Sequence, residues 1–258
     1  MNTDKFSNTI PAPPPLRELI GNANDWALFL DFDGTLLDLA ERPDAIRVPA
    51  DLPRLLHDLA QRFGGAVAIL TGRALANLDR HLPEPELAAA GQHGAEWRLA
   101  GQGAIAEVDR QALAGPRAEI KRFSATHPTV LVEDKGASIA LHYRAAPEAR
   151  AEVDALAETL VGASGGALEA ISGKLLCELR PAGANKGRAL RNFLAQAPFA
   201  GRRPLVLGDD VTDEAAFAAA LVLGGSAIKV GEGESRAPWR LHDPKAAHAW
   251  LAAALAPY

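Results

Sequence analysis

Two aspartates separated by one residue are the first candidates for chemistry in this chain. Asp31 and Asp33 follow the apolar run at 28–30. In an extended chain successive side chains point to opposite sides, so residues two apart share a side and both carboxylates face one point. Gly34 then permits a sharp turn, and Thr35 can hydrogen-bond the backbone to fix it. Taken alone, this pattern is equally typical of an ordinary Asp-Gly turn at a strand exit.

Two predicted helix starts carry groups that could hold a phosphate. Thr71 and Gly72 follow the apolar run at 66–70, and a hydroxyl with free backbone amides at a helix start can bind phosphate oxygens. Lys186 opens a later helix, where its ammonium could point at a phosphate. Each also has a plain structural interpretation, as an N-cap threonine and as a solvated lysine.

A third cluster is acidic and follows the apolar run at 204–207. Asp209, Asp210, Asp213 and Glu214 lie within six positions. The helix dipole favours acidic residues in a first turn, which explains the last two better than Asp209 at the strand exit. If these carboxylates meet the earlier aspartates, their repulsion raises their pKa values unless a cation shares the site. Mg²⁺ prefers such oxygen ligands, and zinc-type Cys and His ligands are not clustered.

The elements that position these clusters alternate along the chain. Short apolar runs separated by helical segments predict an α/β core with a parallel sheet buried on both faces. Loops at the carboxyl ends of such strands form a ligand crevice, so we expect the polar clusters to meet there. The predicted strands are 27–30, 66–70, 204–207 and 226–230, and the predicted helices are near 50–63, 72–81, 186–196, 212–221 and 244–255.

The pattern changes in the middle of the chain, where paired strands with helices predict an antiparallel α+β layer. Its predicted strands are 129–133, 138–143, 167–171 and 174–179, with a helix at 147–161 and turns at 135–136 and 172–173. We therefore expect three parts: an N-terminal tail over 1–24, a catalytic core over 25–108 and 183–258, and an inserted cap over 109–182.

Composition excludes several classes of function. The net charge is −5 with no basic stripe, which argues against a nucleic-acid partner. Apolar stretches fall short of the roughly 20 residues that cross a bilayer, so no membrane role is expected. The single cysteine, Cys177, cannot form an internal disulfide, and no signal peptide is recognisable. We expect a cytoplasmic monomer that binds a small anionic substrate through local cations.

The order of the motifs resembles the haloacid dehalogenase (HAD) superfamily of phosphotransferases: Asp-x-Asp-Gly-Thr, then Thr-Gly after a strand, then Lys, then Gly-Asp-Asp-x-x-Asp. The resemblance implies a HAD-like Rossmannoid core. It implies that Asp31 is a nucleophile forming an aspartyl-phosphate, and that Asp33 first donates a proton to the leaving oxygen and then activates water.

The same resemblance implies the remaining roles in the core. Thr71 and Lys186 are expected to clamp the phosphate. Mg²⁺ is expected on Asp31, the backbone carbonyl of Asp33, and Asp209, with support from Asp210 and Asp213.

Five further segments are similar to the trehalose-6-phosphate phosphatase family: 91–96, 132–138, 140–144, 173–181 and 208–214. The similarity runs from about Trp26 to Leu251. It implies hydrolysis of trehalose 6-phosphate in trehalose biosynthesis, with Glu133, Lys135 and Glu178 contacting the sugar. From the residues alone, cross-strand Glu–Lys pairing on a solvated sheet face is the stronger interpretation.

Several alternatives stay open from the sequence. The enzyme could hydrolyse another sugar phosphate, such as sucrose phosphate or a glycosyl-glycerate phosphate. It could be a phosphomutase, or a sugar-phosphate sensor without catalysis. His142 is expected to be structural because it lies mid-strand without a second ligand nearby. No roles are assigned to Arg73, Arg144 and Lys174.

Overall fold

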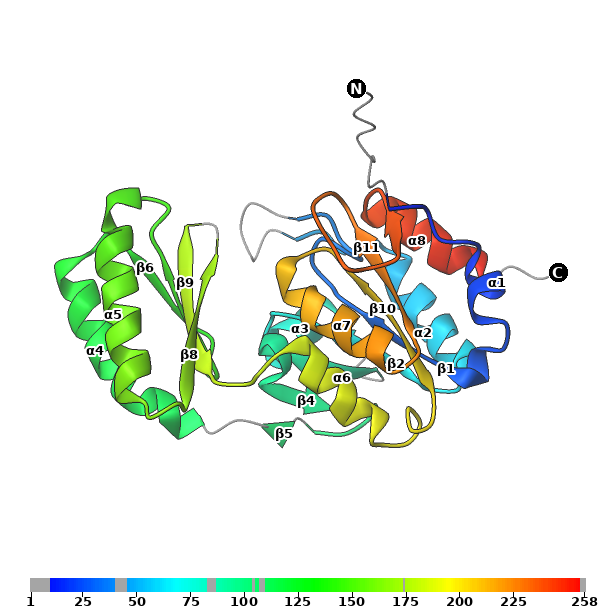
Figure 1. The fold of residues 1–258 in the computed structure, drawn as a ribbon, viewed down its shortest axis with the longest axis horizontal. Coiled ribbons are helices and arrows are strands. Elements are labelled where there is room, and N and C mark those ends of the chain that lie inside the picture. Colours follow the sequence, from blue (N-terminus) through cyan, green and yellow to red (C-terminus); the bar gives the residue numbers. More distant parts are fainter. Residues whose placement is uncertain are drawn as a thin grey trace, which may run out of the picture.

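The structure is a computed structural model that describes residues 10–39, 46–82, 87–103, 105–106, 110–173 and 175–255. Its larger sheet has eight strands in the order β12-β11-β10-β1-β2-β3-β4-β5 (Figure 1). Neighbours from β12 to β3 pair in parallel, and β4 and β5 extend the sheet antiparallel. The strands are β1 (Trp26–Leu30), β2 (Val67–Leu70), β3 (Ala88–Gly91), β4 (Glu96–Arg98), β5 (Ile105–Ala106), β10 (Arg203–Gly208), β11 (Ser226–Val230) and β12 (Trp239–Leu241).

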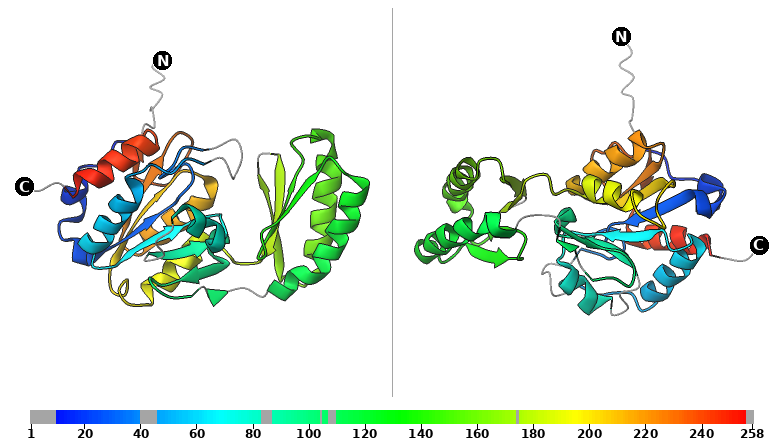
Figure 2. Two further views of the ribbon diagram at one scale, coloured as in Figure 1. Left: turned by 180° about the vertical axis from the view of Figure 1, so that it is seen from behind. Right: turned by 90° about the horizontal axis from the view of Figure 1, so that it is seen from below.

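Helices cover both faces of this sheet, which confirms the predicted α/β class (Figure 2). Alternate residues of β1 enter two hydrophobic clusters: Leu28 and Leu30 pack with α2 and α8, and Phe29 packs with α6 and α7. A strand buried on both faces has to be apolar throughout, as β1 is. The helices are α1 (Leu16–Ile20), α2 (Leu52–Arg62), α3 (Leu75–His81), α6 (Lys186–Leu194), α7 (Glu214–Val222) and α8 (Pro244–Ala253).

The segment before β1 differs from the expected tail. Leu16 and Ile20, four residues apart on α1, are buried in the core. The Trp250 indole donates to the Pro14 carbonyl at 2.9 Å, and Arg17 Nε donates to the Ala254 carbonyl at 3.0 Å. This segment therefore packs against α8, and of the expected tail only residues 1–9 lie outside the described part of the chain.

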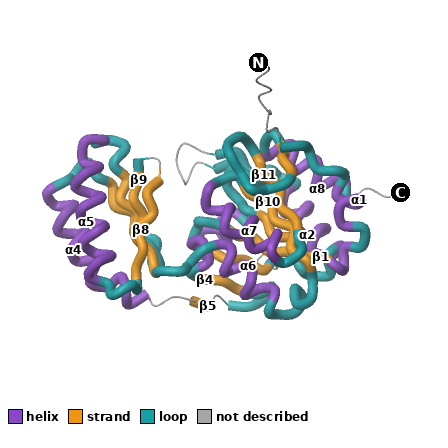
Figure 3. Tube along the Cα trace, in the orientation of Figure 1, coloured by secondary structure: helices purple, strands orange, loops and turns teal. Residues whose placement is uncertain are grey.

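A second, four-stranded antiparallel sheet has the order β6-β7-β9-β8. Its strands are β6 (Leu131–Asp134), β7 (Ile139–His142), β8 (Leu168–Gly173) and β9 (Leu176–Pro181). Helices α4 (Ala114–Thr126) and α5 (Arg150–Ala163) cover one face, where Ile139, Leu141 and Leu179 are buried. We call this lobe, residues 110–181, the cap. Figure 3 shows its sheet between these helices and the larger lobe, which we call the core.

Short 3-10 helices lie between the other elements: η1 (Ala23–Asp25), η3 (Gln92–Gly94), η4 (Arg110–Leu113), η5 (Pro147–Ala149) and η6 (Val211–Asp213). The last of these helices delays α7 to Glu214, two residues after its predicted start. The turn expected at 172–173 is part of β8, and the hairpin reverses through Leu175 with φ of 62°. Lys174 lies outside the described residues.

No helix in the described part of the chain has the length and hydropathy of a membrane-spanning segment.

Candidate active site

Three adjacent parallel strands bring the polar clusters to one edge of the core sheet. Asp31, Thr71 and Asp209 directly follow β1, β2 and β10, and β1 lies between the other two. The register pairs Leu30 with Leu207 and with Ile69, so the three strands end level with one another. The motifs thus lie where an open α/β sheet forms its ligand crevice.

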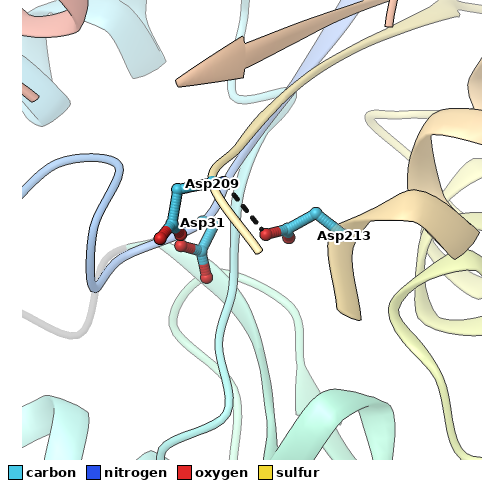
Figure 4. A group of neighbouring side chains, drawn as sticks. All are labelled: Asp31, Asp209 and Asp213. Carbon is cyan, nitrogen blue, oxygen red and sulfur yellow. Dashed lines mark hydrogen bonds between the residues drawn. The ribbon is translucent and has the colours of Figure 1, made fainter. Parts of the chain in front are cut away.

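Three carboxylates converge there, as Figure 4 shows. Asp31, Asp209 and Asp213 each offer an oxygen, and these atoms lie within 4.8 Å of one another. Lys186 Nζ donates to Asp31 Oδ1 at 2.6 Å and to Asp213 Oδ1 at 2.7 Å. Asp31, Asp213 and Lys186 are all buried. The ammonium group therefore compensates two buried negative charges, which would otherwise be costly to desolvate.

Asp213 holds the acidic loop in shape. Its Oδ2 accepts the backbone N–H groups of Asp209 and Asp210, each at 3.1 Å, while Oδ1 accepts from Lys186. Both oxygens are thus used within the protein, which fits a supporting role. The exposed Asp210 points elsewhere, because its carboxylate accepts from Val211 N at 2.7 Å and caps η6. Gly208 is required here because a Cβ would overlap the Asp213 side chain.

Burial sets the protonation of this cluster. The pKa of Asp31 is raised to about 7, because burial outweighs the lowering effect of Lys186 and the Asp209 charge adds to the effect of burial. Burial also raises the pKa of Asp213 to about 6, against the opposing effect of Lys186. Burial alone would lower the pKa of Lys186, but the carboxylates of Asp213 and Asp31 raise it well above its ordinary value. Lys186 therefore stays protonated and carries the compensating charge.

The cluster has the donors that a divalent cation needs. Asp31 Oδ2 is buried and has no hydrogen-bond partner among the described residues. A buried carboxylate oxygen normally accepts a hydrogen bond or binds a cation, so this atom is a candidate ligand for a cation. Thr35 Oγ1 donates to Asp209 Oδ1 at 3.3 Å, which orients the neighbouring carboxylate. Hard oxygen donors in this arrangement suit a cation of the Mg²⁺ type.

Asp33 is not one of these three carboxylates and is held by Arg73, a residue without an assigned role in the sequence analysis. Arg73 Nε donates to Asp33 Oδ2 at 2.6 Å and Nη2 donates to Oδ1 at 2.7 Å, a bidentate pair. Arg73 Nη1 also donates to Asn77 Oδ1 at 2.8 Å, and its backbone N–H donates to Thr71 Oγ1 at 3.1 Å. The buried Thr71 hydroxyl thus shapes the loop that presents this arginine.

Sequence reasoning also missed Lys229. This lysine lies in the wholly buried strand β11, and its Nζ donates to the backbone carbonyl of Asp209. Lysine is rarely buried without a specific partner. A lysine inside a predicted buried strand was therefore an available signal for a contact of this kind.

The cap places its polar set on the face away from its helices. The register aligns Glu133 and Glu178 on either side of Ala140, so both side chains share one face of the sheet. Glu178 Oε1 accepts from Ser138 Oγ at 2.6 Å and lies 3.4 Å from Lys135 Nζ. The three residues predicted to contact the sugar thus lie on one side of the cap.

Charge and hydrogen bonding keep both glutamates ionised. A hydrogen bond from His142 lowers the pKa of Glu133, with His142 Nε2 at 3.0 Å from Glu133 Oε2. Burial alone would raise the pKa of Glu178, but Lys135 and other neighbours lower it below its ordinary value. His142, which is expected to be structural, thus has Glu133 as a partner. Arg144 is exposed.

The cap and the core touch at η3. Ala137 N in the β6–β7 turn donates to Gln92 Oε1 in the core at 3.0 Å. His93 Nε2 in the core lies 3.8 Å from Glu178 Oε2 in the cap. The face of the cap that carries Glu178 is therefore turned toward the core.

Comparison with known proteins identifies the family. Residues 29–245, most of the chain, match the model of the trehalose-phosphatase family. The chain belongs to this family. A probable trehalose-phosphate phosphatase of Sinorhizobium fredii is 44% identical over 216 residues, covering 84% of this chain and 82% of the relative. The trehalose-6-phosphate phosphatase of Escherichia coli is 36% identical over 239 residues, which cover 92% of this chain and 89% of that protein.

A solved structure is similar over the same extent. In the crystal structure of a trehalose-6-phosphate phosphatase related protein, the chain has 29% sequence identity to this one. The two structures align with a TM-score of 0.71 over 88% of this chain and 95% of the other. The resemblance drawn from the motifs is therefore confirmed. The range matched to the trehalose-phosphatase family includes Asp31, Lys186 and Asp213 as well as the whole cap sheet.

Proposed function

We propose that this trehalose-phosphatase hydrolyses trehalose 6-phosphate to trehalose and phosphate with Mg²⁺, as a step of trehalose biosynthesis. The observation that carries the proposal is the buried network in which Lys186 joins Asp31 and Asp213 beside Asp209. Membership of the family and the names of the relatives from Sinorhizobium fredii and Escherichia coli support the choice of substrate.

The nucleophile of the proposed reaction is Asp31. Lys186 holds its Oδ1, and its Oδ2 lacks a partner among the described residues, so the carboxylate keeps lone pairs both for a cation and for attack on phosphorus. Attack forms an aspartyl-phosphate and breaks the bond from phosphorus to the sugar oxygen. Lys186 and Thr71 hold the phosphoryl oxygens, and the ammonium offsets the negative charge that builds up.

Asp33 is the proposed proton carrier. It donates a proton to the departing sugar oxygen, then takes one from the water that hydrolyses the aspartyl-phosphate. Arg73 orients its carboxylate through two hydrogen bonds, and this pair would have to open for Asp33 to carry and donate a proton.

Mg²⁺ would be held by Asp31, the backbone carbonyl of Asp33, and Asp209, with Asp213 in support. When bound, it supplies positive charge that lowers the repulsion between the phosphate and the carboxylate nucleophile. Asp210 would act only through the shape of the loop, because its side chain caps η6.

The cap would provide the specificity. Glu133, Lys135 and Glu178 offer two acceptors and a donor for sugar hydroxyls, and cap closure would exclude bulk water. We further propose that residues 109–182 act as the cap of a catalytic core over 25–108 and 183–258. The protein would act as a monomer in the cytoplasm, without nucleic-acid or membrane partners.

A panel of sugar phosphates, assayed for phosphate release with and without Mg²⁺, tests this function. Trehalose 6-phosphate should be preferred over sucrose phosphate, glycosyl-glycerate phosphate and p-nitrophenyl phosphate, and excess EDTA should stop turnover. Preference for another ester would reject the substrate. Failure of isotope-labelled water to enter the phosphate would indicate a phosphomutase, and binding without turnover would indicate a sensor.

A further inference from the structure

The residues Gln92 and His93 in η3 lie between the cap and the loop at 71–73, which is proposed to bind the phosphate and which we call the phosphate loop. The proposed mechanism does not use these two residues. Both have positive φ values, 48° and 58°, which are uncommon for residues other than glycine. Their backbone N–H groups donate to the loop itself: Gln92 N to the Arg73 carbonyl at 2.8 Å, and His93 N to the Thr71 carbonyl at 3.0 Å. A rare backbone conformation held by hydrogen bonds often marks a functional position.

The side chain of Gln92 holds this turn in place through hydrogen bonds. Its Nε2 donates to Glu96 Oε1 at 3.1 Å, and its Oε1 accepts from Ala137 N of the cap at 3.0 Å. Glu96 Oε1 also accepts from Leu75 N at 2.8 Å, at the start of α3. The buried side chains of Gln92 and Glu96 thus tie the cap turn, η3 and the loop before α3 together. The next residue, His93, has its position fixed from several sides.

The imidazole of His93 lies between the phosphate loop and the sugar-binding face. It packs so closely on Gly72 that a Cβ there would be 2.8 Å from His93 Cε1. On its other side, Nε2 is 3.8 Å from Glu178 Oε2, which is longer than a hydrogen bond. His93 Nδ1 is buried and has no hydrogen-bond partner among the described residues. This ring therefore has hydrogen-bonding capacity that the protein does not satisfy.

The surroundings keep this imidazole neutral. The pKa of His93 is lowered to about 3, first by burial and also by the neighbouring cations Lys186, Arg180 and Lys135, against the opposing effect of Glu178. A neutral imidazole has one N–H donor and one acceptor nitrogen. A hydroxyl group, which both donates and accepts, matches this pair. An anionic phosphate would be better served by the cation already present at Lys186.

We propose that His93 is a specificity-determining residue that hydrogen-bonds a hydroxyl of the sugar ring carrying the phosphate. Its place between Gly72 of the phosphate loop and Glu178 of the cap lets one ring contact link both halves of the site. The inference rests on the proposed function, since it requires a phosphorylated sugar as substrate.

Two variants of His93 test the inference. His93→Asn keeps a residue that tolerates positive φ, and His93→Gly removes the side chain without strain at that φ. The matched control is His57→Asn, an exposed histidine on α2. For both His93 variants we expect kcat/KM on trehalose 6-phosphate to fall about tenfold or more, the effect of losing one buried hydrogen bond. Turnover of p-nitrophenyl phosphate, which has no sugar hydroxyl, should stay close to that of the parent protein.

Deoxy analogues of trehalose 6-phosphate, each lacking one hydroxyl of the phosphorylated ring, identify the partner group. On one analogue the parent protein and the His93 variants should have equal kcat/KM, because the contact is already absent. If the His93 variants lose equal factors of kcat/KM on trehalose 6-phosphate and on p-nitrophenyl phosphate, the role of His93 is purely structural. If their turnover of trehalose 6-phosphate is undiminished, His93 has no role. Either result overturns the inference. If the parent protein itself prefers another sugar phosphate, the proposed function fails, and the same ratio measured with that sugar still decides the role of His93.

Discussion

Replacing Lys186 by methionine should destabilise the protein through the two carboxylates that it leaves behind. The ammonium makes contacts of 2.6 Å to Asp31 and 2.7 Å to Asp213, and all three side chains are at most 5% exposed. Removing one partner of a buried ion pair typically costs about 3–5 kcal/mol. We expect a loss of about 4 kcal/mol in the free energy of unfolding near pH 7.5, a large part of the stability of a typical domain.

The pH dependence of this loss has a definite sign. The folded-state pKa values of Asp31 and Asp213, about 7 and about 6, exceed the ordinary value of 3.8. Such carboxyls bind more protons in the folded than in the unfolded state, so the folded state gains stability as the pH falls through this range. Without Lys186 both pKa values should rise further. The deficit of Lys186→Met should therefore shrink when the pH is lowered to about 5.5.

Urea unfolding in EDTA at the two pH values measures the effect without interference from bound metal. Lys121→Met, at an exposed lysine of α4, is the matched control and should change stability little. Combining Lys186→Met with Asp213→Asn should recover part of the loss, because one of the two uncompensated charges is then removed. The reasoning is refuted by a deficit below about 1 kcal/mol near pH 7.5, or by a deficit that stays unchanged at the lower pH.

Three further predictions concern the reaction. Asp31→Asn should still bind trehalose 6-phosphate but form no acid-stable, base-labile phosphoenzyme in a labelling experiment; any such phosphoenzyme would assign the nucleophile elsewhere. Glu133→Ala should lower kcat/KM for trehalose 6-phosphate far more than for p-nitrophenyl phosphate, since a lost remote contact weakens cap closure, and equal losses would reject the sugar-binding role. Arg73→Lys cannot form the bidentate pair with Asp33, so kcat should fall roughly tenfold or more with little change in thermal stability, and an unchanged kcat would remove Arg73 from the positioning of Asp33.

The sequence predicted the central strands because burial on both faces leaves a clear apolar run. β1, β2, β10 and β11 are of this kind, with bounds within about one residue of the prediction. β3 was missed because its run Ala88–Gly91 has no β-branched or aromatic residue and its place in the sheet is set by its neighbours. β4, β5 and β12 have only two or three residues each and carry no period of their own.

The site was predictable as far as strand ends determine position. Asp31 and Asp209 follow neighbouring strands, so topology alone brings them together. The partners of the other side chains in the site depend on three-dimensional contacts. Nothing in the spacing indicates that Arg73 pairs with Asp33 forty residues away, or that Asp210 turns outward to cap η6. Such contacts depend on loop paths that local sequence patterns do not determine.

In the proposed mechanism the two aspartates of the first motif take different roles, and in the structure different cations hold them. Asp31 is buried, pairs with Lys186 through one oxygen, and keeps the other without a partner among the described residues. Asp33 has a side chain 28% exposed and uses both oxygens to bind Arg73. Because burial raises the pKa of Asp31 to about 7, a bound divalent cation would both neutralise the phosphate and keep the nucleophile ionised. In that mechanism the more exposed Asp33 exchanges protons with the leaving oxygen and with the incoming water.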